Sequence, residues 1–255
     1  MENERYDFGN ILFSGPCNAK CPECIGKLLE ETKKQLNNLQ IYPLLNIEPF
    51  VALLKKQGVR EVIFTGTNTD PQLYGYEEQL IADLRRELGD NVLLSLHTNG
   101  RLAVKRRSTF NQYDKATISI PSFTPEVYKA MMGVSPNFDL SQILNLAKMP
   151  IKISRLTSLT NREDCAAFLR HCLTLGIKRV AFRKLFGEVL EWEDLVDING
   201  LGMQKIRNFH GNSVYNYKDM EVTLWDFSAT GCRSISLFSD GHISDHYLLI
   251  DAMKQ

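Results

Sequence analysis

The sequence has no excess of either charge. Its 255 residues carry 30 Lys and Arg side chains against 30 Asp and Glu side chains, so the formal net charge is zero. Proteins that bind nucleic acid or anionic membranes through their overall field carry a surplus of positive charge. The local basic run Lys105, Arg106 and Arg107 is explained by a solvated helix face. We therefore expect neither nucleic acid nor a membrane among the partners.

Long apolar runs are also missing. No stretch approaches the roughly 20 apolar residues that span a bilayer, and the chain has no low-complexity tract or obvious short repeat. We find no signal peptide, so we expect a cytoplasmic protein whose thiols stay reduced. With 44% hydrophobic residues, the chain can build one large core, and single α/β barrels commonly have this length.

Cysteines are few, but three of the six are clustered. Cys17, Cys21 and Cys24 have the spacing C-x3-C-x2-C. A cubane iron–sulfur cluster is normally held by four thiolates, so three ligands would leave one iron open for chemistry. A structural zinc site needs four Cys or His ligands, and the neighbouring sequence offers no fourth. Clustered cysteines in a reducing compartment also argue against a disulfide framework.

Apolar runs alternate with amphipathic segments along the first 187 residues. Repeated βα units form a parallel sheet with right-handed crossovers, and ligands bind at the carboxyl ends of its strands. The predicted strands are 11–13, 61–64, 92–96, 116–120, 151–156 and 179–182. The predicted helices are 26–39, 47–57, 74–88, 124–132, 140–148 and 162–175.

The cysteine loop follows the first predicted strand, after Ser14-Gly15-Pro16. Triplet and position together resemble the radical S-adenosylmethionine (SAM) superfamily, and the resemblance covers roughly residues 10–187. It implies an α/β fold, a partial (β/α)6 TIM-like barrel over residues 1–187. It also implies that Cys17, Cys21 and Cys24 ligate one oxygen-sensitive [4Fe–4S] cluster whose fourth iron binds SAM. An electron donor such as flavodoxin or ferredoxin would then drive cleavage of SAM to a 5′-deoxyadenosyl radical.

The resemblance also assigns SAM-binding roles to residues at the strand ends. The segment 64–71 stands where the family carries a Gly-Gly-Glu-Pro type motif, but it is longer by about two residues and lacks the second glycine. Within it, Asp70 would supply the carboxylate, and an Asx turn is the alternative interpretation. The implied SAM-binding residues are Gly66, Asp70, Thr98, Asn99, Ser119, Ser154, Arg155 and Leu185.

Three basic residues near the fifth and sixth strand ends have their own alternatives. Arg155 would form two parallel hydrogen bonds with the carboxylate of SAM, or else a surface salt bridge with an acidic residue of a loop. Arg183 and Lys184 would contact an anionic group on the substrate, or else form a solvated rim. Two further departures from the family pattern are Glu23, where an aromatic residue is usual, and Pro121, where an acid is frequent.

Residues 188–255 are predicted to form a short α+β extension that covers the barrel mouth. It would contain a helix at 201–209 and short strands at 222–225 and 235–238. It resembles a reduced form of the extension in GTP 3′,8-cyclase and SPASM/twitch enzymes, whose auxiliary clusters need several cysteines. Only Cys232 is present, so no auxiliary cluster is expected. Cys232 is a candidate hydrogen donor to a substrate radical, although a lone cysteine is more often simply buried.

We thus expect a radical SAM enzyme acting on a small molecule, such as a nucleotide or sugar derivative. The alternatives are a peptide-modifying radical SAM maturase and a non-catalytic iron–sulfur or zinc protein. Fold and cofactor do not specify the substrate or the outcome of the reaction.

Overall fold

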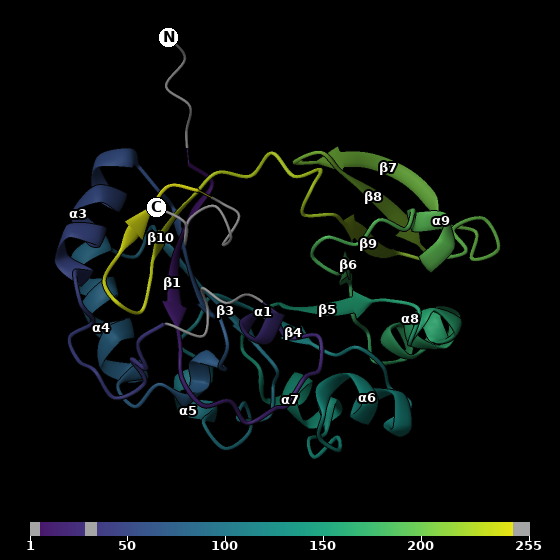
Figure 1. The fold of residues 1–255 in the computed structure, drawn as a ribbon, viewed down its shortest axis with the longest axis horizontal. Coiled ribbons are helices and arrows are strands. Elements are labelled where there is room, and N and C mark those ends of the chain that lie inside the picture. Colours follow the sequence, from purple (N-terminus) through teal and green to yellow (C-terminus); the bar gives the residue numbers. More distant parts are fainter. Residues whose placement is uncertain (1–5, 29–34, 247–255) are drawn as a thin grey trace, which may run out of the picture.

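The structure, a computed structural model, describes residues 6–28 and 35–246. Within those residues, the strands form one eleven-stranded sheet in the order β11-β10-β1-β2-β3-β4-β5-β6-β9-β8-β7 (Figure 1). Neighbours from β10 through β9 run parallel, and β11, β8 and β7 pair antiparallel. The strands are β1 (Phe8–Phe13), β2 (Glu61–Gly66), β3 (Leu93–Thr98), β4 (Lys115–Ser119), β5 (Ile151–Thr157), β6 (Arg179–Lys184), β7 (Gln204–Phe209), β8 (Asn212–Tyr217), β9 (Met220–Trp225), β10 (Ser234–Leu237) and β11 (Ile243–Ser244).

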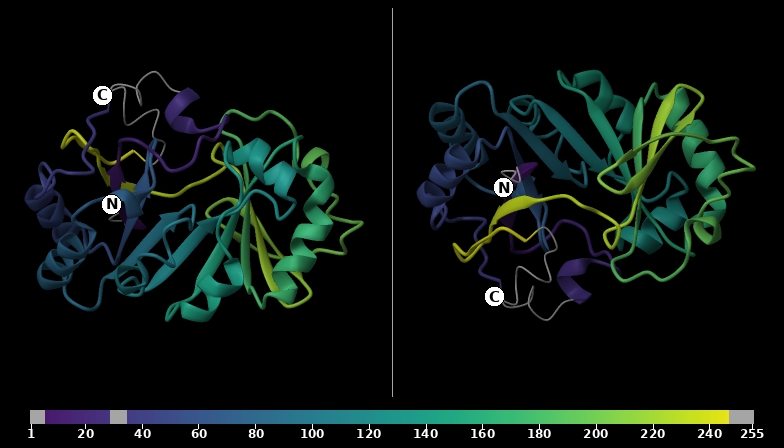
Figure 2. Two further views of the ribbon diagram at one scale, coloured as in Figure 1. Left: turned by 90° about the horizontal axis from the view of Figure 1, so that it is seen from below. Right: turned by 90° about the horizontal axis from the view of Figure 1, so that it is seen from above.

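Helices α3 (Ile47–Gln57), α4 (Glu77–Leu88), α7 (Leu140–Leu146) and α8 (Cys165–Thr174) lie on the convex side of the curved sheet, whereas the short α1 (Ile25–Leu28) lies at its open side (Figure 2). The described residues also form α5 (Arg107–Phe110), α6 (Pro125–Met132) and α9 (Trp192–Leu195), with 3-10 turns η1 (Pro71–Leu73) and η2 (Arg162–Asp164). None of the helices in the described ranges is long and apolar enough to cross a membrane.

The two faces of the sheet differ in polarity because side chains alternate along each strand. The residues that face the helices join one apolar core, for example Phe64, Ile118, Ile153 and Phe182. The residues between them face the concave side, and many are polar: Glu61, Ser95, His97, Lys115, Thr117, Ser119, Lys152, Ser154 and Arg183. A sheet buried between two apolar layers would carry apolar residues on both faces. The concave face is therefore suited to water or a polar ligand.

The parallel α/β core agrees with the predicted fold class, and all six predicted strands are present. The sheet does not close into a barrel: β11 and β7 are its edges, each with a single neighbour among the described strands. The C-terminal third adds strands to both sides, because β9 pairs with β6 and β10 pairs with β1. Residues 226–233 connect them across the opening (Figure 1). The division at residue 187 and the covering of the mouth stay predictions.

Two predicted helices are wrong. Of the helix predicted over 26–39, the structure describes α1 at Ile25–Leu28, and residues 35–39 are not helical; residues 29–34 lie outside the described ranges. The segment predicted as a helix over 201–209 contains strand β7. His210 and Gly211 both have positive φ, 47° and 83°, and this two-residue turn pairs β7 with β8 as a hairpin. The tertiary pairing overrides the weak local helix pattern.

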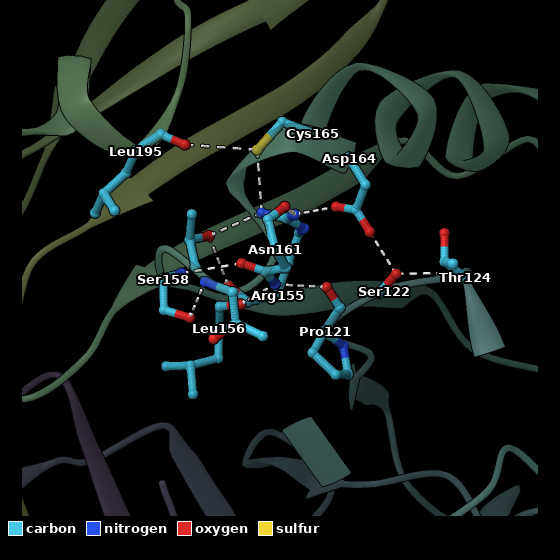
Figure 3. Close-up of polar contacts among 12 residues, drawn as sticks. Pro121, Ser122, Thr124, Arg155, Leu156, Ser158, Asn161, Asp164, Cys165 and Leu195 are labelled. Atoms are coloured by element: carbon cyan, nitrogen blue, oxygen red, sulfur yellow. Dashed lines mark hydrogen bonds and ion pairs between the residues drawn. The ribbon is translucent and has the colours of Figure 1, made fainter. Parts of the chain in front are cut away.

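Arg155 is not placed to bind SAM, which corrects its predicted role. Its side chain is fully buried at 0% exposure and faces the helices, stacked over the rings of Phe168 and Phe182. Its guanidinium forms an ion pair with Asp164 and donates to the carbonyl oxygen of Asn161 (Figure 3). The salt-bridge alternative is thus the correct one, in a buried rather than a surface position.

The same network joins the loops that follow β4 and β5. Asp164 also accepts a hydrogen bond from the Ser122 hydroxyl, and Asn161 Nδ2 donates to the carbonyl oxygens of Pro121 and Leu156, each at 2.8 Å (Figure 3). The carboxyl ends of β4 and β5 are therefore held in a fixed relation to each other.

Replacing Asp164 with Asn should destabilise the protein by about 3 kcal/mol, because it leaves the buried Arg155 charge without its counter-ion. Asn preserves the shape of the side chain. Urea denaturation of wild type and variant measures the difference. The matched control is Glu163→Gln, next in the chain, whose 85% exposed side chain pairs with Arg162 and should matter by less than about 1 kcal/mol. Equal losses in the two variants would contradict the prediction.

Candidate functional site

The three clustered cysteines lie together beyond the carboxyl end of β1. Cys17 is exposed, Cys21 and Cys24 are half-buried, and all three are free thiols. Burial, together with the charges of Cys24 and Cys17, raises the pKa of Cys21 to about 11. Thiols that repel one another as thiolates are stabilised by a shared cation, which lowers thiol pKa values. The donor set and its partial exposure fit a metal cluster with one side open.

The C-terminal end of α6 is in direct contact with the cysteine loop. The backbone N–H of Lys20 donates to the carbonyl oxygen of Met132 at 2.8 Å. Gly133 has a φ of 65°, and a Cβ there would lie 2.1 Å from the carbonyl oxygen of Lys20. The sulfur atoms of Cys21 and Met132 are 3.8 Å apart. Only glycine permits this approach, which fixes the middle of the loop.

The unusual loop after β2 braces the cysteine loop from another side. Asn68 Oδ1 accepts from the backbone N–H of Gly15 at 2.9 Å, and the Thr69 hydroxyl donates to the carbonyl oxygen of Pro16 at 2.6 Å. A Cβ at Gly26 would lie 2.2 Å from Cβ of Asn68, and a Cβ at Gly66 would lie 1.8 Å from the carbonyl oxygen of Thr69. The polar residues that replace the family motif therefore bind the protein's own backbone.

Asp70, Thr98 and Asn99 are brought together, as the sequence predicted for residues of one site. Asp70 is 3% exposed. Its carboxylate accepts from the Thr98 hydroxyl at 2.8 and 3.0 Å, from the backbone N–H of Asn99 at 2.7 Å and from that of Gln72 at 3.0 Å. Asn99 Nδ2 donates to Asn18 Oδ1, inside the cysteine loop, at 2.7 Å.

These bonds change the role of Asp70. Both of its oxygens already accept hydrogen bonds within the protein, and the bond from Gln72 is the Asx turn of the alternative interpretation. Burial raises the pKa of Asp70, and hydrogen bonds from Asn99, Thr98 and Gln72 act in the opposite direction. Asp70 is thus placed to hold the strand ends rather than to contact SAM directly, which corrects the expectation from sequence.

Ser119 and Ser154 are paired neighbours on β4 and β5. Both face the concave side, since the adjacent Ile118, Ile153 and Arg155 face the helices. The Ser154 hydroxyl is buried and has no hydrogen-bond partner in the described part of the chain. A buried hydroxyl without a partner is costly, which fits a position that a polar ligand or water completes.

Leu185 lies half-buried just after β6. Burial raises the pKa of Glu23, and the charge of Glu188 in the Leu185 loop raises it further. The predicted positions Gly66, Thr98, Asn99, Ser119, Ser154 and Leu185 therefore share the carboxyl edge of the sheet with the cysteines.

Arg183 and Lys184 point to opposite faces. Lys184 is 5% exposed, forms an ion pair with Asp226 at 3.0 Å and lies 5.4 Å from the centre of the Trp192 ring. Its predicted contact with substrate is therefore wrong, because its charge is already neutralised on the helix side. Arg183 faces the concave side and remains a candidate.

The sequence reasoning missed other concave-face residues near Arg183. Burial, together with the charges of Arg179, Arg183 and Lys115, lowers the pKa of Lys152 to about 8. Burial also lowers the pKa of His97 well below its usual value, as do Lys152, Arg183 and Lys115. Strict alternation along the strands, applied to residues 93–98, 115–119 and 151–157, would have found His97, Lys115 and Lys152.

Cys232 lies at the wrong end of the sheet for a hydrogen donor. It precedes β10, and β10 pairs in parallel with the beginning of β1, Phe8 with Ser234. The cysteine loop follows the end of β1, a strand of six residues, which spans about 20 Å. A thiol hydrogen moves to a radical only in contact, so this placement does not suit the predicted role.

Sequence comparison identifies no relatives: no protein-family profile matches, and no curated protein matches. Solved structures do match. SuiB from Streptococcus suis bound to precursor peptide SuiA has a TM-score of 0.55 at 16% identity, covering 71% of this chain and 40% of that one. SuiB bound to S-adenosylmethionine has a TM-score of 0.55 at 15% identity, covering 74% and 42%.

A third match is native anSMEcpe with bound AdoMet, with a TM-score of 0.50 at 18% identity over 70% of this chain and 52% of that chain. The chain spans about two-fifths of the length of the SuiB structures it matches. At these identities the likeness shows the fold, an α/β fold shared with radical SAM enzymes.

A buried carboxyl group, that of Glu77, is connected to this site through Arg106. Glu77 has 0% side-chain exposure, accepts from the Tyr113 hydroxyl at 2.8 Å and lies 3.3 Å from Arg106 Nη2. Arg106 also donates to the carbonyl oxygen of Tyr74 at 3.0 Å and to that of Gln72, in the turn that follows Asp70. Burial raises the pKa of Glu77 to about 7, against the opposing charge of Arg106.

This shift predicts a pH-dependent stability. Between pH 4.5 and 7 the unfolded chain has lost the Glu77 proton while the folded protein retains it, so stability falls as the pH rises. The loss amounts to about 3 kcal/mol and is complete above pH 7. The difference in the free energy of unfolding between wild type and Glu77→Gln, measured by urea denaturation from pH 4 to 8, isolates this contribution. The control is Glu78→Gln, at the exposed neighbouring residue, which should keep the wild-type dependence of stability on pH. If the difference between wild type and Glu77→Gln does not change across this pH range, the assignment is refuted.

Proposed function

We propose that the protein is a radical SAM enzyme that holds one [4Fe–4S] cluster on Cys17, Cys21 and Cys24. The observation that carries the proposal is the group of three free thiols at the carboxyl edge of the parallel sheet, braced by the loops after β2 and β3 and by α6. Such a cluster, once loaded and reduced with SAM bound, would supply a 5′-deoxyadenosyl radical that abstracts hydrogen from substrate.

The chain's own residues would position the reactants. Ser119 and Ser154 offer hydroxyl groups toward SAM from two strand ends that the Arg155 network holds in place. Asn99 orients Asn18 beside Cys17, and Asp70 fixes Asn99 through its backbone N–H. Leu185 would pack against the adenine and keep water away from it. An electron donor such as flavodoxin or ferredoxin would reduce the cluster.

The substrate is proposed to be a small molecule with an anionic group. Lys152, Arg183 and Lys115 act on His97 and on one another across the concave face, where Glu61 pairs with Lys115 at 2.8 Å. Their combined field favours a phosphate or carboxylate in this place. Equal stimulation of SAM cleavage by neutral and anionic forms of the same candidate substrate would contradict this.

A peptide substrate is the second candidate. The observation that favours it is strand β7, an edge of the sheet whose six residues are all exposed. An exposed edge can pair with an extended peptide through backbone hydrogen bonds. One of the similar structures, SuiB, is bound to a precursor peptide. Proline substitution within β7 would abolish modification of a peptide and leave modification of a small molecule intact.

The direct test is anaerobic reconstitution with iron and sulfide, reduction by dithionite and addition of SAM, with 5′-deoxyadenosine measured by mass spectrometry. We expect product from wild type and none above background from the variant with Cys17, Cys21 and Cys24 replaced by Ala. Cys172→Ala, which removes a buried cysteine outside the loop, is the matched control and should stay active. A fully loaded wild-type cluster that forms no 5′-deoxyadenosine would favour a non-catalytic iron–sulfur protein. Zinc in its place would favour a zinc protein.

A further inference from the structure

Three side chains that commonly bind metals meet at the amino edge of the sheet, at the other end of β1 from the cysteine loop. Asp7 precedes β1, His210 forms the turn between β7 and β8, and Cys232 lies in the segment between β9 and β10. Their ligand atoms all lie within 4.8 Å of one another. The Asp7 Oδ1 to His210 Nε2 distance is 3.7 Å. The proposed SAM chemistry uses none of the three.

Backbone hydrogen bonds hold Asp7 in this position. Its N–H donates to the carbonyl oxygen of Arg233 at 2.9 Å, and the N–H of Arg233 donates back to Asp7 Oδ2 at 2.8 Å. The other carboxylate oxygen, Oδ1, faces His210. Metal-binding carboxylates are typically oriented by such a hydrogen bond to the oxygen that does not ligate.

The backbone also fixes the position of His210. Its φ of 47° places it in the left-handed region, at the tip of the hairpin. Its carbonyl oxygen accepts from the N–H of Gly231 at 3.1 Å. A Cβ at Gly211 would lie 2.1 Å from the carbonyl oxygen of Ala229, so the hairpin turn and the segment that carries Cys232 are in close contact. The backbone therefore determines the spacing of the imidazole and the thiol.

We propose that Asp7, His210 and Cys232 bind a divalent metal ion of the zinc type, with water as a fourth ligand. One carboxylate oxygen, one imidazole nitrogen and one thiolate are a donor set that suits zinc. Ligand atoms around tetrahedral zinc are about 3.3 to 3.6 Å apart, close to the separation already present between Asp7 and His210. Cys232 is buried whereas Asp7 is exposed, which leaves a solvent side for the water.

The ion would connect parts of the chain on both sides of the opening in the sheet. Asp7 belongs to the β1 side and His210 to the β7–β8 hairpin on the other side, while Cys232 lies on the segment that crosses between them (Figure 1). Binding there would oppose separation of the two edges, so the metal should stabilise the folded protein.

The test is a Co²⁺ titration of the full chain with Cys17, Cys21 and Cys24 replaced by Ala, which removes the cysteine loop as a competing site. One equivalent should bind with a thiolate-to-cobalt absorption band in the near ultraviolet. Cys232→Ser should lose this band, and His210→Ala should weaken binding at least about 100-fold. His242→Ala removes an exposed histidine of the β10–β11 turn and should change neither.

A second measurement uses the wild-type chain with its cysteine loop intact. Added Zn²⁺ should raise the Tm of wild type and of His242→Ala by several degrees more than that of His210→Ala or Cys232→Ser. Cobalt binding without a thiolate band, or a zinc-induced Tm shift that is the same in all four proteins, would overturn the proposal. The contact would then be an ion pair beside a buried thiol. Neither result depends on SAM cleavage.

Discussion

The buried carboxylate of Asp70 is the interaction on which the candidate site depends. It accepts hydrogen bonds from Thr98, Asn99 and Gln72, and so joins the loop after β2 to the end of β3. Both of these segments then contact the cysteine loop, through Asn68, Thr69 and Asn99. A charge buried at this depth is tolerated because its oxygens are well supplied with donors.

The polarity of the sheet follows from its curvature. Helices cover the convex face and supply the apolar core, so apolar residues are needed at only every second position of a strand. The remaining positions face a concave side that collects serine, histidine, lysine and arginine side chains. Burial and mutual repulsion lower the pKa of Lys152 to about 8, which a bound anion would reverse.

The sequence was sufficient for the strands of the parallel core, because their apolar runs are short, regular and bounded by turn residues. Helix α3 was predicted with its observed bounds, Ile47–Gln57. The roles of Arg155 and Lys184 were not predictable from position at a strand end alone. Alternation decides which face a side chain takes, and both residues fall on the helix side.

Strand β7 was mistaken for a helix because its partner β8 follows it in the chain and sets its conformation. The position of Cys232 depends on long-range pairing of β10 with β1, which no local pattern encodes.

Electron paramagnetic resonance of the reduced, reconstituted protein tests most directly whether the cysteine loop holds a cluster with one open iron. Four irons per chain and a [4Fe–4S] signal that changes when SAM is added would be the expected result, since SAM can reach the iron that no thiolate occupies. A loaded cluster whose signal is indifferent to SAM, or a cysteine loop that retains zinc and takes up no iron, would contradict the proposed function.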